Sequence, residues 1–274
     1  MTLSRPRVRG LLDGFGLTPS RALGQNFVTD PNTVRRIVAE SGVNAGERVL
    51  EVGPGLGSLT LALVERGCSV VAVEMDRHLV PALREVLAEA GAQVELINAD
   101  AMQVDLASLG LPVAMVANLP YNVAVPIVLR LAEGMPSLRS MTALVQREVA
   151  DRLAAAPGSK TYGAPSLAVA WWGRAKVTSK VPASVFMPKP RVDSAVVRID
   201  RHDPAPLWHA SCSRERYEQV VRAAFAQRRK MLRSSLRGVV PPEAFAAAGL
   251  TGDERAEQLD AATFAGLAGY PSPS

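Results

Sequence analysis

Residues 48–57, RVLEVGPGLG, decide the fold of this chain. The first half, 48–52, predicts a buried strand, and an amphipathic helix is expected from Ser58 to about Arg66. Strand, glycine loop and helix in this order are typical of a ligand-binding edge, because glycines let the backbone approach a ligand and a helix N-terminus offers free N–H groups. The G-x-G-x-G spacing after Glu51 fits an amino-acid moiety with a carboxylate better than a pyrophosphate.

Two further predicted strands lead to acidic residues. The strand at 69–73 ends at Glu74, 17 residues after Gly57, and an acid at the second strand tip usually accepts hydrogen bonds from ribose hydroxyls. Such an acid disfavours a bound 2′-phosphate. After the strand at 93–97, Asp100 could accept a hydrogen bond from an adenine amine while the Ala101 N–H donates to a ring nitrogen. Asp100 alone would be an ordinary turn residue, but its place in this series indicates a ligand site.

The fourth strand tip carries Asn118-Leu119-Pro120-Tyr121 after the apolar run 113–117. The Asn118 amide oxygen can accept a hydrogen bond from an amine. Pro120 biases Leu119 towards an extended backbone, so the Leu119 carbonyl can point outward. Tyr121 offers a flat face on which a base could stack. Together these residues predict a grip on a planar ring that bears an exocyclic NH₂ group.

The alternation of strands and helices predicts an α/β fold with a mostly parallel, doubly wound sheet of the Rossmann-like type. Later strands are expected at 167–172, 175–181 and 195–199, and the last two could pair antiparallel. Between them, the prolines of FMPKP forbid regular structure and hold Phe186 rigidly, so this stretch is either a covered edge or a binding loop.

We expect two domains, a catalytic domain at 1–200 and a small helical domain at 201–274. Residues 1–22 form a basic arm, which is either a solvated tail or a phosphate contact. A long helix is predicted at about 214–236. The segment 222–237 contains six basic residues and no acid, namely Arg222, Arg228, Arg229, Lys230, Arg233 and Arg237. A solvated helix face normally alternates in charge sign, so this run favours a phosphate-binding ridge.

Composition limits the classes of function that this chain can have. It has 274 residues, a net charge of +5, and 26 Arg against 5 Lys, a balance that suits nucleic acid or reflects a codon bias. Cys68, Cys212 and the three histidines show no disulfide or metal-ligand spacing. The N-terminus has no apolar signal-peptide core, and no apolar run is long enough to span a membrane. We therefore expect a cytoplasmic monomer without a metal or a membrane partner.

The series Gly53/Gly55, Glu74, Asp100 and Asn118 resembles that of class I methyltransferases, which bind S-adenosylmethionine (SAM) on a doubly wound sheet. Asn-Leu-Pro-Tyr is similar to the signature of the amino-methyltransferases among them. Further motifs resemble the KsgA/RsmA family of rRNA adenine N6,N6-dimethyltransferases; they are LGQNF at 23–27, EVGPGLGSLT at 51–60, NLPYN at 118–122, FMPKPRVDSA at 186–195 and Phe225-x-x-Arg-Arg-Lys-x-Leu. The resemblance runs from about residue 20 to 237, and Val28 departs from the Leu that the family usually has.

The resemblance implies transfer of methyl groups from SAM to N6 of two adjacent adenosines. These adenosines lie in the 3′-terminal hairpin loop of small-subunit (16S) rRNA, and they are dimethylated during biogenesis of the 30S subunit. It implies that the catalytic residues are Asn118, Leu119, Pro120, Tyr121 and Phe186, with both aromatic rings around a flipped-out base. It implies that SAM is bound by Asn26, Val28, Gly53, Gly55, Glu74, Asp100, Ala101 and Asn118.

Three alternatives stay open. A large-subunit (23S) rRNA adenine N6-dimethyltransferase of the antibiotic-resistance type would have nearly the same active site, although the Phe-x-x-Arg-Arg-Lys segment favours the small-subunit enzyme. A non-catalytic rRNA-binding assembly factor would not need Asn118 and Glu74. An NAD-dependent oxidoreductase would not need Asn-Leu-Pro-Tyr, and its loop would normally read G-x-G-x-x-G.

Overall fold

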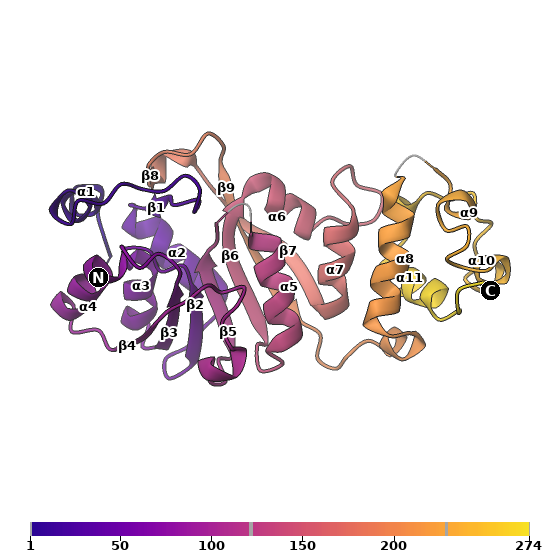
Figure 1. Cartoon of the computed structure of the whole chain (residues 1–274), viewed down its shortest axis with the longest axis horizontal. Helices are drawn as coiled ribbons and strands as arrows, with labels where there is room; N and C mark the ends of the chain where they lie inside the picture. Colours follow the sequence, from indigo (N-terminus) through magenta and orange to yellow (C-terminus); the bar gives the residue numbers. More distant parts are fainter. Residues whose placement is uncertain (1, 121–122, 228–229, 274) are drawn as a thin grey trace. The chain divides into compact units, whose positions relative to one another are not determined.

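The computed structural model describes residues 2–120, 123–227 and 230–273 (Figure 1). The chain divides into two compact units, one formed by residues 1–150 and 176–200 and the other by 151–175 and 201–274. We expected the boundary near residue 200, with 151–175 in the first domain. This segment instead contributes Tyr162, Leu167 and Trp171 to the core of the second unit. Apolar contacts, and not chain order, therefore set the division.

The first unit is built on a seven-stranded sheet in the order β4-β3-β2-β5-β6-β9-β7. The pairs β2–β3, β2–β5, β3–β4 and β5–β6 are parallel, and β9 is antiparallel to β6. The strands are β2 (Arg48–Val52), β3 (Ser69–Glu74), β4 (Val94–Asn98), β5 (Ala114–Asn118), β6 (Ser140–Gln146), β7 (Gly173–Val181) and β9 (Ser194–Arg201). The predicted α/β fold, with its mostly parallel sheet and late antiparallel strand, is confirmed.

Helices between the strands cover this sheet, as Figure 1 shows. They are α2 (Pro31–Ser41), α3 (Ser58–Glu65), α4 (Val80–Glu89) and α5 (Ala124–Gly134), while α6 (Arg147–Leu153) follows the end of β6. The helix α2 starts where the sequence predicts, because the Asp30 carboxylate accepts a hydrogen bond from the Thr33 N–H at 2.8 Å and Pro31 occupies the first turn. It ends at Ser41, and its C-cap is Gly42, whose φ of 68° few other residues tolerate. The central strands are buried on both faces, as parallel strands between helix layers must be.

The basic arm is an ordered helix, α1 (Arg5–Gly14). It buries Val8, Leu11 and Leu12 in a cluster with α4 residues such as Leu83. Arg5 donates to the Ser184 and Phe186 carbonyl oxygens at 2.6 and 3.0 Å, and Arg7 pairs with Glu89. The description of this segment as a partly ordered arm is therefore wrong, because its apolar face has a partner in α4.

A two-stranded ribbon lies outside the main sheet. Strand β1 (Phe27–Val28) pairs antiparallel with β8 (Phe186–Met187), and Thr29 adds hydrogen bonds from its N–H and its hydroxyl to the Val185 carbonyl. Two segments that are far apart in sequence, LGQNF and FMPKP, are thus joined through their backbones. The stretch around Phe186 forms a short paired strand and not only an irregular loop.

The second unit is helical. It contains α7 (Ala164–Trp172), α8 (Arg214–Ala226), α9 (Leu232–Ser235), α10 (Pro242–Ala247) and α11 (Ala261–Ala268). The chain also has the 3₁₀ helices η1 (Leu106–Leu109), η2 (Ala183–Val185), η3 (Leu207–Ser211) and η4 (Ala256–Gln258). The strand predicted at 167–172 is wrong, because Gly163 and Pro165 start the helix α7 there. None of the described helices is long and apolar enough to cross a bilayer.

The long helix predicted at 214–236 is also wrong. The helix α8 ends at Ala226, and α9 begins only at Leu232. After the break, the Leu232 N–H donates to the Glu254 carbonyl at 2.9 Å and the Arg233 N–H donates to the Gly252 carbonyl at 2.9 Å. Pairing with a distant segment thus replaces helical hydrogen bonds. Like charges three or four residues apart also repel one another on a helix, so this run of basic residues does not stabilise a continuous helix.

Candidate active site and cofactor cavity

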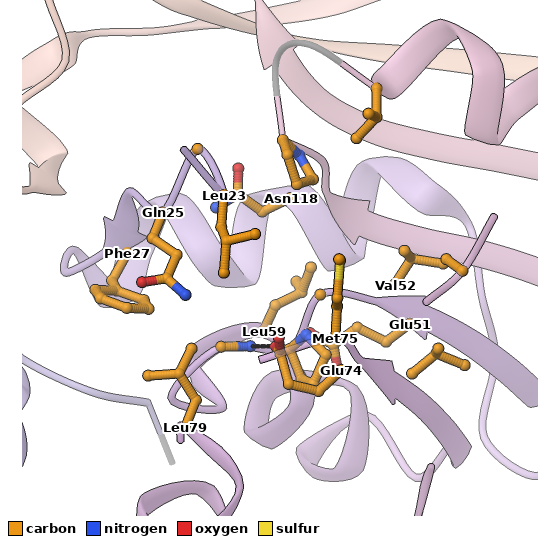
Figure 2. Close-up of a pocket in the computed structure, with 18 of the residues that line it drawn as sticks. Leu23, Gln25, Phe27, Glu51, Val52, Leu59, Glu74, Met75, Leu79 and Asn118 are labelled. Atoms are coloured by element: carbon orange, nitrogen blue, oxygen red, sulfur yellow. Dashed lines mark hydrogen bonds between the residues drawn. The ribbon is translucent and has the colours of Figure 1, made fainter. Parts of the chain in front are cut away.

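A cavity of about 370 Å³ lies in the first unit at the carboxyl ends of the central strands. Figure 2 shows Glu51, Val52, Glu74 and Asn118 at the strand tips around it. Nine predicted site residues line the cavity, namely Asn26, Val28, Gly53, Gly55, Glu74, Asp100, Ala101, Asn118 and Pro120. The fold therefore collects the four strand tips, and the LGQNF segment as well, around a single space.

The glycine loop forms one wall of this cavity, and its backbone requires glycine. Gly55 has a φ of 59°, and a Cβ at this position would lie 3.0 Å from the Phe27 ring. Gly57 has a φ of 94°, and its Cβ would come within 2.8 Å of Leu83. Any larger residue would thus strain the backbone and displace a packed side chain. The close approach of Phe27 also brings the LGQNF segment against the loop.

Glu74 lies at the tip of β3 and is buried, with 6% of its surface exposed. One carboxylate oxygen accepts from the Gly55 N–H at 2.9 Å (dashed in Figure 2), and the other accepts from the Asp76 N–H at 2.8 Å. Burial raises the pKa of this carboxyl, and the two N–H donors oppose the rise. Each oxygen has a second lone pair. Glu74 therefore fixes the loop and can still accept hydrogen bonds from ligand hydroxyls.

Glu51 is a second acid of the cavity, at 1% exposure. Burial, reinforced by the negative charge of Glu74, raises the pKa of Glu51 to about 8. Its Oε2 atom is buried and has no hydrogen-bond partner among the residues that the structure describes. A buried, unpartnered carboxyl oxygen at a cavity wall suits a cationic ligand group, because an opposite charge would restore the lost solvation.

Asp100 stabilises a turn and also lines the cavity. Its Oδ1 atom accepts from the Met102 N–H at 2.8 Å and its Oδ2 atom accepts from Gln103 at 3.0 Å. Asp100 is therefore a turn residue, as its local sequence suggests, and it lines the cavity as well. The adjacent Ala101 is buried, and its carbonyl holds the Arg130 guanidinium at 3.0 Å.

Asn118 is anchored through one end of its amide. Its Nδ2 atom donates to the Asn26 carbonyl at 2.9 Å. This bond orients the side chain, and within the described part of the chain nothing donates to its Oδ1 atom or to the Leu119 carbonyl. The Leu119 N–H donates to the Leu144 carbonyl at 3.1 Å, and its side chain is buried. Two acceptors are thus held at the end of β5. Tyr121 lies outside the described residues.

Phe186 is not where its predicted role requires. Its side chain is fully buried in the core cluster that contains Val28 and Val196, and it does not line the cavity. A ring with no exposed face cannot stack on a base in this conformation. The cause is the β1–β8 pairing, which sets Phe186 opposite Val28.

Several residues that line the cavity have no role predicted from the sequence. They include Gln25, Leu23, Met75, Met102 and Ile127. Leu23 and Gln25 lie within LGQNF, so their motif is visible in the sequence, but their contacts could not be predicted. Met75 and Met102 follow strand ends and Ile127 is in α5; no pattern distinguishes such apolar lining residues from core residues.

The charge of the cavity is one-sided. Among its described lining residues are Glu51, Glu74 and Asp100, and none of the described ones is Lys, Arg or His. Carboxyl groups without a basic partner disfavour a pyrophosphate and favour a ligand with cationic groups and hydroxyls, because a bound cation would offset the rise in pKa that burial causes in Glu51 and Glu74. Within the part of the chain that the structure describes, no cluster of His, Cys, Asp and Glu could hold a metal ion.

The predicted basic ridge is only partly available. Arg228 and Arg229 lie outside the described residues. Arg222 pairs with Glu218 at 3.3 Å, and Arg233 pairs with Asp253 at 2.6 Å. The segment 222–237 contains no acid, but acidic residues outside it pair with two of its arginines. Lys230 and Arg237 are exposed, and neither forms an ion pair with the residues that the structure describes.

A family model described as ribosomal RNA adenine dimethylase matches residues 17–270, which is nearly the whole chain. The chain belongs to this dimethylase family. Among its relatives, a protein named ribosomal RNA small subunit methyltransferase A from Rhodococcus opacus is 48% identical, and the match covers 97% of this chain and 93% of that protein. A protein of the same name from Kineococcus radiotolerans is also 48% identical, over 98% of this chain and 91% of that protein.

Two solved structures resemble the dimethylase fold seen here. A dimethyladenosine transferase from Plasmodium falciparum has a TM-score of 0.77 at 20% identity, with 88% of this chain and 95% of that chain covered. The 23S rRNA methyltransferase ErmE has a TM-score of 0.69 at 29% identity, with 88% and 98% covered. The chain is thus an rRNA adenine dimethyltransferase with a class I methyltransferase fold, and its cofactor is SAM. The acidic cavity fits this cation, which carries a sulfonium, an ammonium and ribose hydroxyls.

The position of Glu74 leads to a first prediction. Glu74→Ala should weaken SAM binding about tenfold to a hundredfold, because each hydrogen bond to a charged group is worth about 1.5–3 kcal/mol. Removal of the bond to Gly55 adds to this by freeing the glycine loop. Isothermal titration calorimetry measures the affinity. Glu95→Ala on the neighbouring strand β4 is the matched control, because Glu95 is exposed and pairs with Arg48 outside the cavity. Equal affinities of Glu74→Ala and the parent would remove Glu74 from the cofactor site.

Proposed function

We propose that this chain transfers methyl groups from SAM to N6 of two adjacent adenosines in the 3′-terminal hairpin loop of small-subunit rRNA, giving N6,N6-dimethyladenosines during subunit biogenesis. The observation that carries the proposal is the anchored Asn118 at the end of β5, beside an acidic cavity. The small-subunit substrate is supported by relatives that bear that name and match this chain over nearly its full length.

The proposed chemistry starts from a poor nucleophile. The lone pair on adenine N6 is delocalised into the ring, so the nitrogen must become pyramidal before it can react. The Asn118 Oδ1 atom and the Leu119 carbonyl would accept hydrogen bonds from the two N6 protons and favour the pyramidal form. When bound, SAM supplies an electrophilic methyl group on its sulfonium. Residues 118–120 hold the nitrogen in position, which contributes by proximity.

No general base is needed in this scheme. The described lining residues include no His or Lys that could take a proton, and the product proton can leave to solvent. The Asn26 carbonyl fixes the Asn118 amide so that its oxygen, and not its nitrogen, is available to the amine. Tyr121 would stack on the flipped-out base. Phe186 would take part in stacking only if the β1–β8 ribbon opened, since the ring is buried.

Substrate RNA would be held by more than the pocket. We assign the rRNA backbone to the C-terminal helical unit, whose exposed Lys230 and Arg237 are its best described candidates. The partner is the immature small subunit, so the protein would act in the cytoplasm, and a monomer suffices because one chain carries all four strand tips. Catalysis is assigned to the first unit and RNA backbone binding to the second.

Primer extension tests this function. Reverse transcriptase stops at N6-dimethyladenosine, so rRNA from cells with the chain should give a strong stop near the 3′ end of small-subunit rRNA. The stop should vanish in cells that lack the chain and return when the chain is restored. Persistence of the stop without the chain, or disappearance of a stop in large-subunit rRNA instead, would overturn the small-subunit assignment. The second outcome would favour the large-subunit enzyme, whose fold is similar.

A further inference from the structure

The cavity has a cover that does not belong to the main sheet. Residues 22–28 all line the cavity, and only their last two residues form a strand, β1. In Figure 2, Leu23 and Asn118 lie on one side of the space, and Glu74 and Met75 lie on the other. We name residues 20–26 the cover segment. A ligand that fills the cavity lies between this segment and the tip of β3.

The two ends of the cover are held differently. At its C-terminal end, Phe27 and Val28 are buried, β1 pairs with β8, and Ser58 donates to the Val28 carbonyl at 2.9 Å. The cover segment itself is half-buried or exposed. Two side-chain bonds tie it to strand ends, from Asn118 at the end of β5 to the Asn26 carbonyl and from Gln25 to Asp76 after β3.

Gln25 uses both ends of its amide. Its Nε2 atom donates to Asp76 Oδ2 at 2.7 Å, and its Oε1 atom accepts from the Ser20 N–H at 2.7 Å. The side chain therefore fixes the fold of the cover segment and ties it to the tip of β3. The acceptor is an ionised carboxylate, which makes this one of the stronger side-chain hydrogen bonds of the region.

Asp76 connects this bond to the predicted ribose acid. Its backbone N–H donates to Glu74 Oε1 at 2.8 Å while its side chain accepts from Gln25. Its other oxygen accepts from the His78 N–H at 3.0 Å, which fixes the carboxylate from the far side. One residue thus joins the acid at the cavity floor to the cover segment.

We propose that Gln25 and Asp76 form a latch that holds the cover segment over bound cofactor and sets how fast the cofactor leaves. This inference rests on the proposed function for the identity of the ligand. Both are positioning residues, because they act on the ligand through the cover segment and through Glu74. Exchange of product for fresh cofactor requires this bond to open, which matters for an enzyme that must transfer several methyl groups to one RNA.

The hydrogen bond of the latch can be removed by one substitution and restored by a second, with donor and acceptor exchanged. Gln25→Glu sets a carboxylate against Asp76 and removes the donor. Adding Asp76→Asn restores a donor opposite Glu, so the hydrogen bond forms again in the reverse direction. The other contacts survive in the double variant, because a carboxylate can still accept from Ser20 and an Asn oxygen can still accept from His78.

The test uses S-adenosylhomocysteine as the probe, with its dissociation rate from the full chain measured by surface plasmon resonance. Gln25→Glu should raise this rate at least about tenfold, the effect expected when one hydrogen bond to a charged group is removed. The double variant should return to within about threefold of the parent. In ligand-free protein, hydrogen exchange of amides 20–26 should rise in the single variant and fall again in the double variant.

Gln219→Glu is the matched control, because Gln219 is exposed, forms a side-chain hydrogen bond with Arg216 and belongs to the second unit, outside the cavity and the cover segment. It should change the dissociation rate by less than about twofold. An unchanged rate in Gln25→Glu, no recovery in the double variant, or an equal effect of Gln219→Glu would each overturn the latch. Failure of the parent to bind S-adenosylhomocysteine would instead overturn the cofactor site itself, so the two failures are distinguishable.

Discussion

Asn118→Ala should reduce methyl transfer about a hundredfold to a thousandfold, the usual cost of removing one oriented hydrogen bond in a transition state. The effect has two sources. The substitution removes the Oδ1 acceptor for the N6 amine, and it removes the Nδ2 donor that binds the Asn26 carbonyl. Single-turnover transfer of labelled methyl groups to unmethylated small subunits measures the effect on chemistry alone.

Two further measurements separate this effect from misfolding. Binding of small-subunit particles should stay at the parental level, because Asn118 lies in the cavity of the first unit and not among the basic residues. The same Asn-to-Ala change at the exposed Asn44 should leave transfer unchanged. Near-parental transfer by Asn118→Ala would mean that the amine is held by other groups, and the proposed mechanism would then be wrong.

The sequence predicted the catalytic sheet well because each strand tip carries its own local signal. A glycine loop with required positive φ angles, an acid after the second strand and Asn-Leu-Pro-Tyr after a buried run are all readable over a few residues. Parallel strands bring such tips to one edge of the sheet, so the position of the cavity followed from chain order. Predicted roles beyond this placement, including that of Glu74, remain predictions.

Features that depend on distant contacts could not be predicted in the same way. The resemblance implied that Phe186 stacks on the base, but pairing of its strand with Val28 leaves the ring buried, and nothing near Phe186 in the sequence indicates that partner. The arginines of the acid-free segment 222–237 were expected to share one face of a continuous helix. The helix is interrupted where the backbone forms hydrogen bonds to Gly252 and Glu254 instead. The charge of Arg233 is neutralised by Asp253.

The partly ordered N-terminal arm and the placement of 151–175 in the first domain were wrong for a related reason. Arg5 and Arg7 were candidates for phosphate contacts, but they bind main-chain carbonyls and a glutamate within the protein. Charge alone does not show whether a basic side chain faces an internal partner or solvent. The segment 151–175 contains Trp171, whose rings pack against Tyr217 at a centroid distance of 4.8 Å, and aromatic packing decides its unit.

The double charge reversal Lys230→Glu with Arg237→Glu should weaken binding to small-subunit particles steeply. Both residues are exposed and lack an ion pair within the described residues, whereas Arg222 and Arg233 share their charge with Glu218 and Asp253. Phosphate contacts set RNA affinity and register without reading sequence. SAM affinity should not change, because neither residue lines the cavity. The slope of log affinity against log salt should flatten by about 0.7–0.9 for each phosphate that the variant no longer binds.

Arg66→Glu with Arg84→Glu is the matched control, because it changes the net charge equally on exposed residues of the first unit. A generic charge effect would weaken both double variants alike and would leave their salt slopes equal. A specific RNA contact would lower affinity and flatten the slope only in the Lys230/Arg237 variant. If that variant bound as tightly as the parent at every salt concentration, RNA contact would have to come from elsewhere. The exposed Arg9 and Arg21 near the N-terminus would then be the next residues to reverse.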